Sequence, residues 1–340
     1  MKPSIAVLNP TCLEVAAAHR AWVEARGAIL RAEPAWKELS PAQVDEAVGE
    51  AQAVVLPAPA LGRQALNELM ARHPALQVYA IAASGYDWLD VEEATRQGVL
   101  VTNSLPPAGA EVVADLAWGL LLAVARQLPH HHRLIQQGDH TRGLGVSAWG
   151  KTLGIVGLGR IGQAMARRAA GFEMRVLAAT PRPDRAFAAA HGIEVVGLDE
   201  LLGQSDFVSL HCRLNEQTRG LLGARELGLM KTRAILINTA RRELVVEAAL
   251  EAALLGGHLG GAGLDDPPSR PDSPLLNLPG VVFAPHLGNR AIEGIHAVFR
   301  GALECALDAL EGRRPAWVVN PQVYALPAFR LARPTRGERE

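Results

Sequence analysis

This chain of 340 residues contains few cysteines and few aromatic residues, and neither sign of charge is in excess by more than one. Its three cysteines, Cys12, Cys212 and Cys305, lie far apart and are odd in number. Neither a disulfide framework nor a zinc-binding spacing follows, so we expect no metal centre and a location in the reducing cytoplasm. Aromatic residues make up 4% of the chain, which disfavours a surface that stacks on RNA bases or on sugars.

The charges are nearly balanced, since 34 basic and 35 acidic residues leave a net charge of −1. Nucleic acids and anionic membranes both attract a basic excess, so we predict neither as a partner. Residues 1–10 lack an apolar segment preceded by positive charge, which predicts no signal peptide. The most apolar stretch, 112–125, is short and contains Asp115, which favours a buried helix over a membrane span.

Short runs rich in Val, Ile and Leu alternate with amphipathic segments along most of the chain. The expected strands are 4–8, 53–56, 76–81 and 99–101, and, after residue 151, 153–156, 175–178, 194–196, 207–210, 234–237, 260–264 and 281–284. The expected helices include 13–25, 41–48, 63–72, 91–96 and a long one over 292–311. Ser40, followed by Pro41 and Gln43, has the pattern of a capped helix start. The fold class is therefore α/β, with two doubly wound parallel-sheet domains.

A glycine motif, Gly157-Leu158-Gly159-Arg160-Ile161-Gly162, directly follows an expected strand and opens an expected helix. The first glycine permits a tight turn, the second lets the backbone approach a pyrophosphate, and the third lets helix and strand pack closely. The start of the helix then offers free N–H groups and a positive dipole end to the phosphates. The segment predicts a dinucleotide site.

The end of the next strand predicts which dinucleotide is preferred. NAD-binding domains place an acidic residue about 20 positions after the motif to bind the ribose hydroxyl. Here Thr180 stands at that position, and Arg182, with Arg185 nearby, offers a partner for a 2′-phosphate. We predict that NADP is preferred over NAD.

Two other patterns are interpreted as having no chemical role. Residues 145–152 fit the P-loop pattern letter for letter, but a polar turn precedes them and a strand follows, which inverts the flanks that phosphate binding needs. The run His130-His131-His132 lies on an expected helix, where adjacent side chains point in different directions, so it predicts solvated histidines and not a metal site.

Four more segments complete a resemblance. They are Ser84-Gly85-Tyr86-Asp87, Asn238-Thr239-Ala240-Arg241, Ala262-Gly263-Leu264-Asp265 and Pro285-His286-Leu287-Gly288. Together with the glycine motif, and in this order and spacing, the chain from about Val78 to Val319 resembles the D-isomer-specific 2-hydroxyacid dehydrogenases. The resemblance implies reduction of a small 2-oxo acid, such as glyoxylate or hydroxypyruvate, to the D-2-hydroxy acid with NADP or NAD.

The resemblance also implies roles for individual residues. Arg241 would bind the substrate carboxylate through its planar fork, and His286 would be the general acid in reduction and the base in oxidation. Backbone N–H groups at Ser84 and Gly85 would hold the other end of the carboxylate, and Asp265 would bond the nicotinamide carboxamide. Further cofactor-lining positions are Cys212, Thr218, Thr239, His286 and Gly288.

The chain departs from the family at the glutamate that holds the catalytic histidine. Counted without a gap, Arg270 takes its place, in a loop that is about three residues shorter than usual. Three alternatives remain open. Asp266 or Asp272 takes over the task; Arg270 faces the substrate and binds a second anionic group; or the protein is a catalytically weak, cofactor-sensing binding protein of the co-repressor type. The second alternative predicts a lowered pKa for His286 and fastest reduction at acidic pH.

The resemblance implies a Rossmann coenzyme domain inserted into a flavodoxin-like substrate domain. We expect residues 104–290 to form the coenzyme domain, and residues 1–103 with 291–340 to form the substrate domain. The active site is expected in the cleft between them, where closure excludes water. A homodimer is also implied, with the apolar helix over 111–126 as part of the contact.

Overall fold

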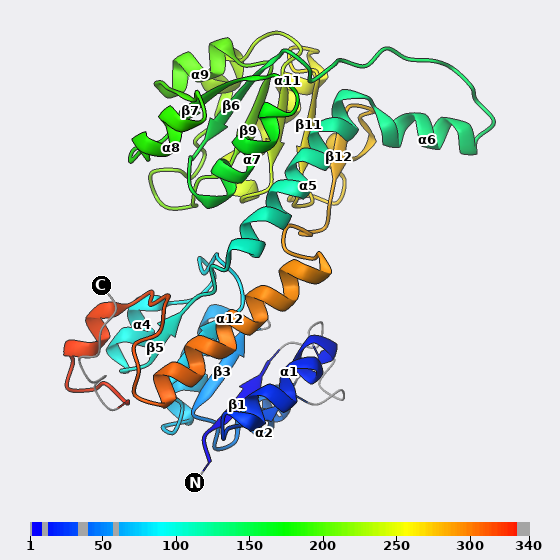
Figure 1. Cartoon of the computed structure of the whole chain (residues 1–340). Helices are drawn as coiled ribbons and strands as arrows, with labels where there is room; N and C mark the ends of the chain where they lie inside the picture. Colours follow the sequence, from blue (N-terminus) through cyan, green and yellow to red (C-terminus); the bar gives the residue numbers. More distant parts are fainter. Residues whose placement is uncertain (1, 9–12, 33–39, 57–60, 332–340) are drawn as a thin grey trace. The chain divides into compact units, whose positions relative to one another are not determined.

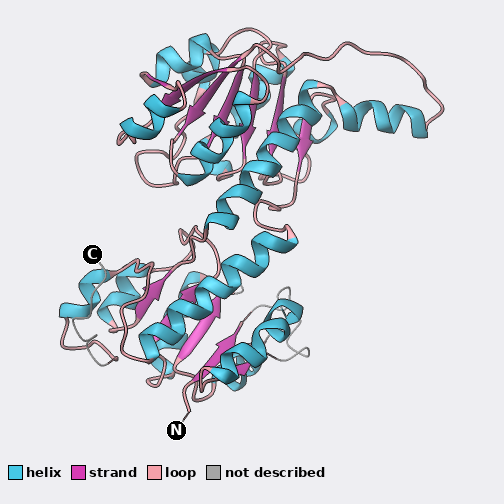
Figure 2. Ribbon diagram, in the orientation of Figure 1, coloured by secondary structure: helices cyan, strands magenta, loops and turns pink. Residues whose placement is uncertain are grey.

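The computed structural model describes residues 2–8, 13–32, 40–56 and 61–331 (Figure 1). The chain forms two compact units, one of Met1–Gly109 with Ile292–Glu340 and the other of Ala110–Ala291. The helix α5 (Pro107–Ala125) runs across the first of these boundaries. Both units contain a parallel β-sheet with helices packed against it, as the ribbon colours in Figure 2 show.

The first unit contains a five-stranded sheet in the order β2-β1-β3-β4-β5. Its strands are β1 (Ser4–Val7), β2 (Ile29–Arg31), β3 (Ala53–Leu56), β4 (Val78–Ile81) and β5 (Leu100–Thr102). Its helices are α1 (Leu13–Ala25), α2 (Pro41–Val48), α3 (Arg63–Arg72), α4 (Val91–Arg96), the long α12 (Ile292–Leu310) and the 3₁₀ helix η4 (Pro321–Ala325). Strands β3 and β4 are buried along their whole length, which explains their continuous apolar sequences.

The local signals in this unit match the structure closely, with one omission. The Ser40 hydroxyl accepts a hydrogen bond from the Gln43 backbone N–H, and the Gln43 side chain accepts one from the Ser40 N–H, so the predicted capping box is formed. The strand β2 was not predicted. It has three residues, lies at the sheet edge and buries only Leu30 fully, so its sequence has no run long enough to indicate a strand.

The second unit contains a seven-stranded sheet in the order β12-β11-β10-β9-β6-β7-β8. Its strands are β6 (Thr152–Val156), β7 (Arg175–Ala179), β8 (Glu194–Val195), β9 (Phe207–Leu210), β10 (Ile235–Asn238), β11 (Gly261–Leu264) and β12 (Val281–Phe283). Its remaining helices are α6 (Leu128–Gln136), α7 (Arg160–Ala170), α8 (Arg185–Ala190), α9 (Leu198–Gln204), α10 (Ala224–Leu229), η2 (Arg242–Leu244), α11 (Glu247–Leu255) and η3 (Pro274–Asn277). The strand order reverses between β6 and β9, and ligands of such sheets bind beyond the carboxyl ends of the strands at that point.

Helix α5 is long and apolar enough to cross a membrane if length and composition alone are considered. Half of its most apolar window is buried inside the structure, and the core helix of a folded domain meets the same criteria. Ala117, Leu121 and Val124 pack into the core of the second unit with Leu153 and Ile155 of β6. The apolar sequence of α5 is therefore explained by burial.

Candidate active site

The glycine turn after β6 has the conformation that its three glycines predict. Gly157 has φ +97°, and a Cβ there would lie 2.7 Å from the backbone nitrogen of Cys212. A Cβ on Gly162 would lie 2.2 Å from the carbonyl oxygen of Gly157. Gly159 is different, because no heavy atom lies within 4 Å of the position of its Cβ. The turn therefore leaves open space at the start of α7, where Arg160 begins the helix and a pyrophosphate would be held.

Two arginines follow β7, and no carboxylate stands directly at the end of the strand. Thr180 is half-buried at the end of the strand, and Arg182 and Arg185 are exposed. The structure records no hydrogen bond or ion pair between either guanidinium and the residues it describes. The nearby Asp184 is occupied as the cap of α8, accepting from the Phe187 N–H at 3.0 Å. The preference for NADP over NAD stays a prediction.

Two further predicted cofactor positions lie at the ends of β9 and β10. The hydroxyl of Thr239 is buried without a hydrogen-bond partner, which is the state expected of a group that awaits a ligand. Cys212 is half-buried, and burial raises the pKa of its thiol to about 11, so it is a protonated lining residue and not a nucleophile. Thr218 lies in a turn and donates to the Arg213 carbonyl at 2.6 Å. These residues and the open glycine turn are compatible with a bound dinucleotide.

The turn that carries Arg241 is shaped by a residue that the sequence did not single out. Asn238, the buried last residue of β10, donates from Nδ2 to the Arg241 carbonyl at 2.7 Å and accepts from the Ala240 N–H at 3.0 Å. Arg241 is extended, and η2 begins at the next residue. The signal for Asn238 was present, since asparagine side chains commonly hydrogen-bond the backbone of the turn they begin.

His286 has an unusual backbone conformation that Asp265 maintains. Its φ is +58°, a region that residues other than glycine rarely adopt. The His286 N–H donates to the Asp265 carbonyl at 3.0 Å, and the buried Asp265 carboxylate accepts from the N–H groups of Leu287 (2.7 Å) and Gly288 (2.8 Å). Burial raises the pKa of Asp265. Asp265 therefore holds the histidine loop, and its contact with the nicotinamide carboxamide stays a prediction.

The imidazole of His286 has a carboxylate partner. Its Nδ1 lies 2.8 Å from Oδ1 of Asp266. This hydrogen bond is the main reason that the pKa of His286 is raised, and burial and the positive charge of Arg241 oppose the rise. The positive charge of Arg241 thus acts on the imidazole. Nδ1 is engaged by Asp266, and Nε2 lies on the opposite side of the ring. A guanidinium and a carboxylate-supported imidazole thus lie within electrostatic range of each other, in the segments that follow β10 and β12.

Comparison with known proteins identifies the family. A model of the D-isomer specific 2-hydroxyacid dehydrogenase NAD binding domain matches residues 118–288. The chain is 41% identical over 273 residues to a glyoxylate reductase of Korarchaeum cryptofilum, covering 77% of this chain and 82% of that protein. The chain belongs to the D-isomer-specific 2-hydroxyacid dehydrogenase family. It is accordingly a D-2-hydroxyacid dehydrogenase with a nicotinamide cofactor.

Other members of the family extend the comparison. A D-3-phosphoglycerate dehydrogenase of Mycobacterium tuberculosis is 43% identical over 257 residues, covering 74% of this chain and 48% of that protein. Among solved structures, the TT0316 protein from Thermus thermophilus has a TM-score of 0.77 and 34% identity, over 94% of this chain and 100% of that one. A glyoxylate reductase from Paecilomyes thermophila has a TM-score of 0.80 and 27% identity, over 94% and 99%. Both confirm the α/β architecture.

The structure decides between the alternatives for the family glutamate. Asp266, and not Asp272, contacts the histidine of this dehydrogenase. The geometry argues against the alternative that Arg270 faces the substrate, because its guanidinium bonds both carboxylate oxygens of Glu251 on α11, at 3.0 and 3.1 Å. That alternative also predicts a lowered pKa for His286 and fastest reduction at acidic pH. The pKa of His286 is instead raised, which argues against it. Arg270 therefore pairs with Glu251, and Asp266 is the residue that contacts His286.

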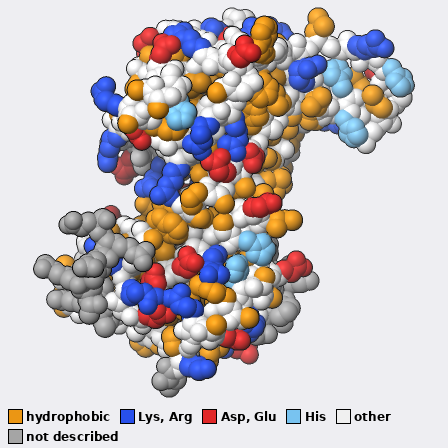
Figure 3. Space-filling model, viewed as in Figure 1, with side chains coloured by type: hydrophobic (Ala, Val, Ile, Leu, Met, Phe, Trp, Pro, Cys, Tyr) orange, Lys and Arg blue, Asp and Glu red, His pale blue; other side chains and the backbone are white. Residues whose placement is uncertain are grey.

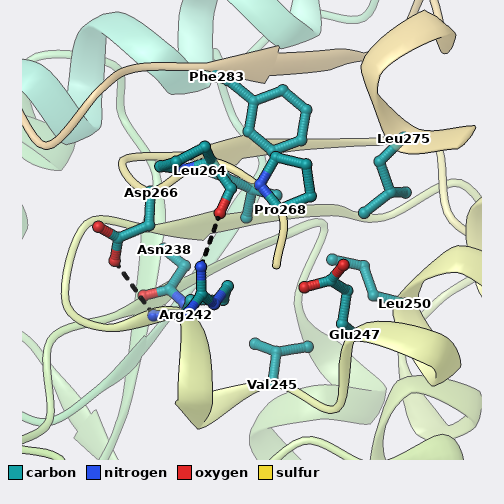
Figure 4. A pocket seen from close by; sticks show the side chains of 11 residues that line it. Asn238, Arg242, Val245, Glu247, Leu250, Leu264, Asp266, Pro268, Leu275 and Phe283 are labelled. Carbon is teal, nitrogen blue, oxygen red and sulfur yellow. Dashed lines mark hydrogen bonds between the residues drawn. The ribbon is translucent and has the colours of Figure 1, made fainter. Parts of the chain in front are cut away.

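Asp266 lines a pocket that is open to solvent (Figure 4). Val245, Leu250, Leu275 and Phe283 form its apolar walls. Figure 4 shows Arg242 bonded twice along its edge, with its backbone N–H donating to Oδ2 of Asp266 and its guanidinium to the Pro267 carbonyl, each at 3.2 Å. Asp266 therefore lines this pocket and also contacts the imidazole of His286.

The predicted carboxylate loop belongs to the first unit of the dehydrogenase. Ser84 and Gly85 follow β4, and the buried Asn103 donates from Nδ2 to the Ser84 carbonyl at 3.0 Å. The Ser104 N–H donates to the Ala83 carbonyl at 3.1 Å, so the segment after β5 supports the loop along its length. Asn103 was not among the predicted residues. That this loop and Arg241 bind one substrate stays a prediction.

Proposed function

We propose that this dehydrogenase reduces a small 2-oxo acid of the glyoxylate or hydroxypyruvate type to the D-2-hydroxy acid, and that NADPH is the preferred reductant. The observation that carries the proposal is the Asp266–His286 pair within the electrostatic reach of Arg241. Relatives named glyoxylate reductase, at about 40% identity, support the choice of substrate class.

In this proposal each side chain has one task. Arg241 binds the substrate carboxylate through two parallel N–H groups, which also orients the adjacent carbonyl. The reduced nicotinamide, when bound, supplies a hydride to the carbonyl carbon. His286 gives the proton on Nε2 to the carbonyl oxygen, so hydride and proton together convert the carbonyl group to an alcohol. Asp266 stabilises the imidazolium through Nδ1, which keeps the acid charged until transfer.

A panel of 2-oxo acids, assayed with NADPH and with NADH, tests the function. It should include glyoxylate, hydroxypyruvate, pyruvate, a dicarboxylate and a phosphorylated 2-oxo acid. We expect the highest kcat/KM for glyoxylate or hydroxypyruvate with NADPH. Turnover of none of these acids, together with binding of the cofactor, would favour the co-repressor type of function instead.

The cofactor preference has its own test in Arg182. We expect Arg182→Ala to raise the KM for NADPH about tenfold, because one charge-assisted contact to the 2′-phosphate is lost, and to leave the KM for NADH nearly unchanged. Arg225→Ala is the matched control, since Arg225 is an exposed arginine on α10 that pairs with Asp199. A wild-type enzyme with higher kcat/KM for NADH would contradict the proposed preference.

We also propose that the enzyme is a homodimer, joined through α5, α6 and the segment that follows them. Helix α6 buries none of its residues, and a nine-residue helix without packing is marginal in water. Leu128, Ile135, Leu144 and Trp149 are exposed at 57%, 60%, 91% and 65%. Figure 3 shows hydrophobic and histidine side chains together on the surface over α6. A second copy of the chain would cover this apolar surface.

The dimer is tested by light scattering coupled to gel filtration. We expect a mass of twice 36.2 kDa for the wild type and of a single chain for Leu144→Asp, which introduces a charge into the proposed contact. Leu255→Asp is the control, because Leu255 is an exposed leucine at the end of α11. A single-chain mass for the wild type at micromolar concentration would contradict the proposal.

A further inference from the structure

Asp266 has hydrogen bonds to both chain segments that carry the proposed catalytic groups. Oδ1 is 2.8 Å from Nδ1 of His286, in the loop after β12. Oδ2 accepts from the backbone N–H of Arg242 at 3.2 Å, at the residue that directly follows Arg241. The two oxygens of one carboxylate are thus divided between the proton donor and the turn of the carboxylate-binding arginine.

Two other polar side chains at the site, Asn238 and Asp265, each bond only one of these two segments. Asn238 bonds the Ala240 N–H and the Arg241 carbonyl, both in its own turn. Asp265 bonds the N–H groups of Leu287 and Gly288 in the histidine loop. Asn238 thus fixes the arginine turn alone, and the Asp265 carboxylate fixes the histidine loop alone. Asp266 instead relates the position of one turn to that of the other.

We propose that Asp266 is a positioning residue for Arg241 as well as for His286. Its contact with the Arg242 N–H sets the distance between the guanidinium and the imidazole, and so matches the site to the fixed span between the adjacent carboxylate and carbonyl of a 2-oxo acid. The inference depends on the proposed roles of Arg241 and His286. A carboxylate that contacted only His286 would affect proton transfer. Asp266 also contacts the turn of Arg241, so its loss should affect substrate binding as well.

The contact can be removed without altering Asp266 or His286. Proline has no backbone N–H, and Arg242 is the first residue of η2, a position that proline favours. The preceding Arg241 is extended, with ψ 139°, as the residue before a proline should be. Both η3 and η4 of this chain begin with proline, at Pro274 and Pro321. Arg242→Pro therefore deletes the donor, and Arg242→Ala is the matched control that deletes the side chain and keeps the N–H.

The experiment measures steady-state kinetics with glyoxylate and NADPH, and calorimetric binding of oxamate, an unreactive analogue of a 2-oxo acid, to the enzyme with NADPH. We expect the KM and the oxamate Kd of Arg242→Pro to exceed those of Arg242→Ala about tenfold, the loss for one hydrogen bond to a charged group, with the same pH dependence of kcat. Asp266→Asn should raise the KM as well and should also move the pH dependence to lower pH. Melting temperature and NADPH affinity show that each variant is folded.

Equal KM and Kd values for Arg242→Pro and Arg242→Ala, in folded proteins, would overturn the inference while leaving the proposed function intact. An unchanged KM in Asp266→Asn with a shifted pH dependence would also overturn it, because Asp266 would then serve His286 alone. A wild-type enzyme that neither reduces glyoxylate nor binds oxamate would overturn the proposed function itself.

Discussion

Replacing His286 by glutamine lowers kcat for 2-oxo acid reduction by about 10²- to 10⁴-fold, the usual contribution of a positioned general acid. Glutamine retains a donor near the carbonyl oxygen but has no proton to transfer. The KM for the 2-oxo acid should change little, because Arg241 still binds the carboxylate. Steady-state kinetics with glyoxylate measure both quantities, and His191→Gln, which alters an exposed histidine at the end of α8, is the control.

The pH dependence of the wild type follows from the same pair. The pKa of His286 is raised above its ordinary value, chiefly by the hydrogen bond with Asp266. Reduction needs the protonated imidazole, so kcat/KM should be constant at acidic pH and fall only above the ordinary histidine value of about 6.5. Oxidation of the hydroxy acid should show the reverse dependence. A decline of reduction that begins below pH 6 would mean that Asp266 does not stabilise the imidazolium.

Replacing Arg241 by lysine lowers kcat/KM by about 10²- to 10³-fold, although the positive charge is retained. A lysine ammonium cannot form the two parallel hydrogen bonds of a guanidinium with a carboxylate, and it cannot hold the adjacent carbonyl at a fixed angle. Most of the loss should appear in the KM for the 2-oxo acid. Varying glyoxylate at saturating NADPH measures this effect directly.

Arg270→Ala is the informative control for Arg241. The Arg270 guanidinium is exposed and pairs with Glu251. The kcat/KM of Arg270→Ala should therefore remain within about threefold of the wild type, as for most surface substitutions. A loss in Arg270→Ala as large as that in Arg241→Lys would restore the alternative in which Arg270 binds the substrate.

Much of the architecture was predictable from the sequence because its signals are local. The boundaries of α1, α2, α3 and α4 agree with the amphipathic segments, and the seven strands of the second unit lie where apolar runs were found. The left-handed turn at Gly157 and the close packing at Gly162 both require the absence of a side chain, as the glycine motif predicts. The family segments could be recognised because each lies next to a strand end, and parallel strands bring such ends to one edge.

The sequence by itself therefore determined the two-sheet architecture, the dinucleotide turn and the identities of Arg241 and His286 as candidates. The tertiary structure alone decided which carboxylate supports the histidine. A count of residues without a gap places Arg270 at the position of the family glutamate. In the structure, the short loop places Asp266 against the imidazole, and Arg270 pairs with Glu251 on α11. The reason is physical: element type depends on neighbours in sequence, whereas the partner of a charged side chain depends on distances of a few ångströms, which are set by the backbone path, including the left-handed conformation of His286.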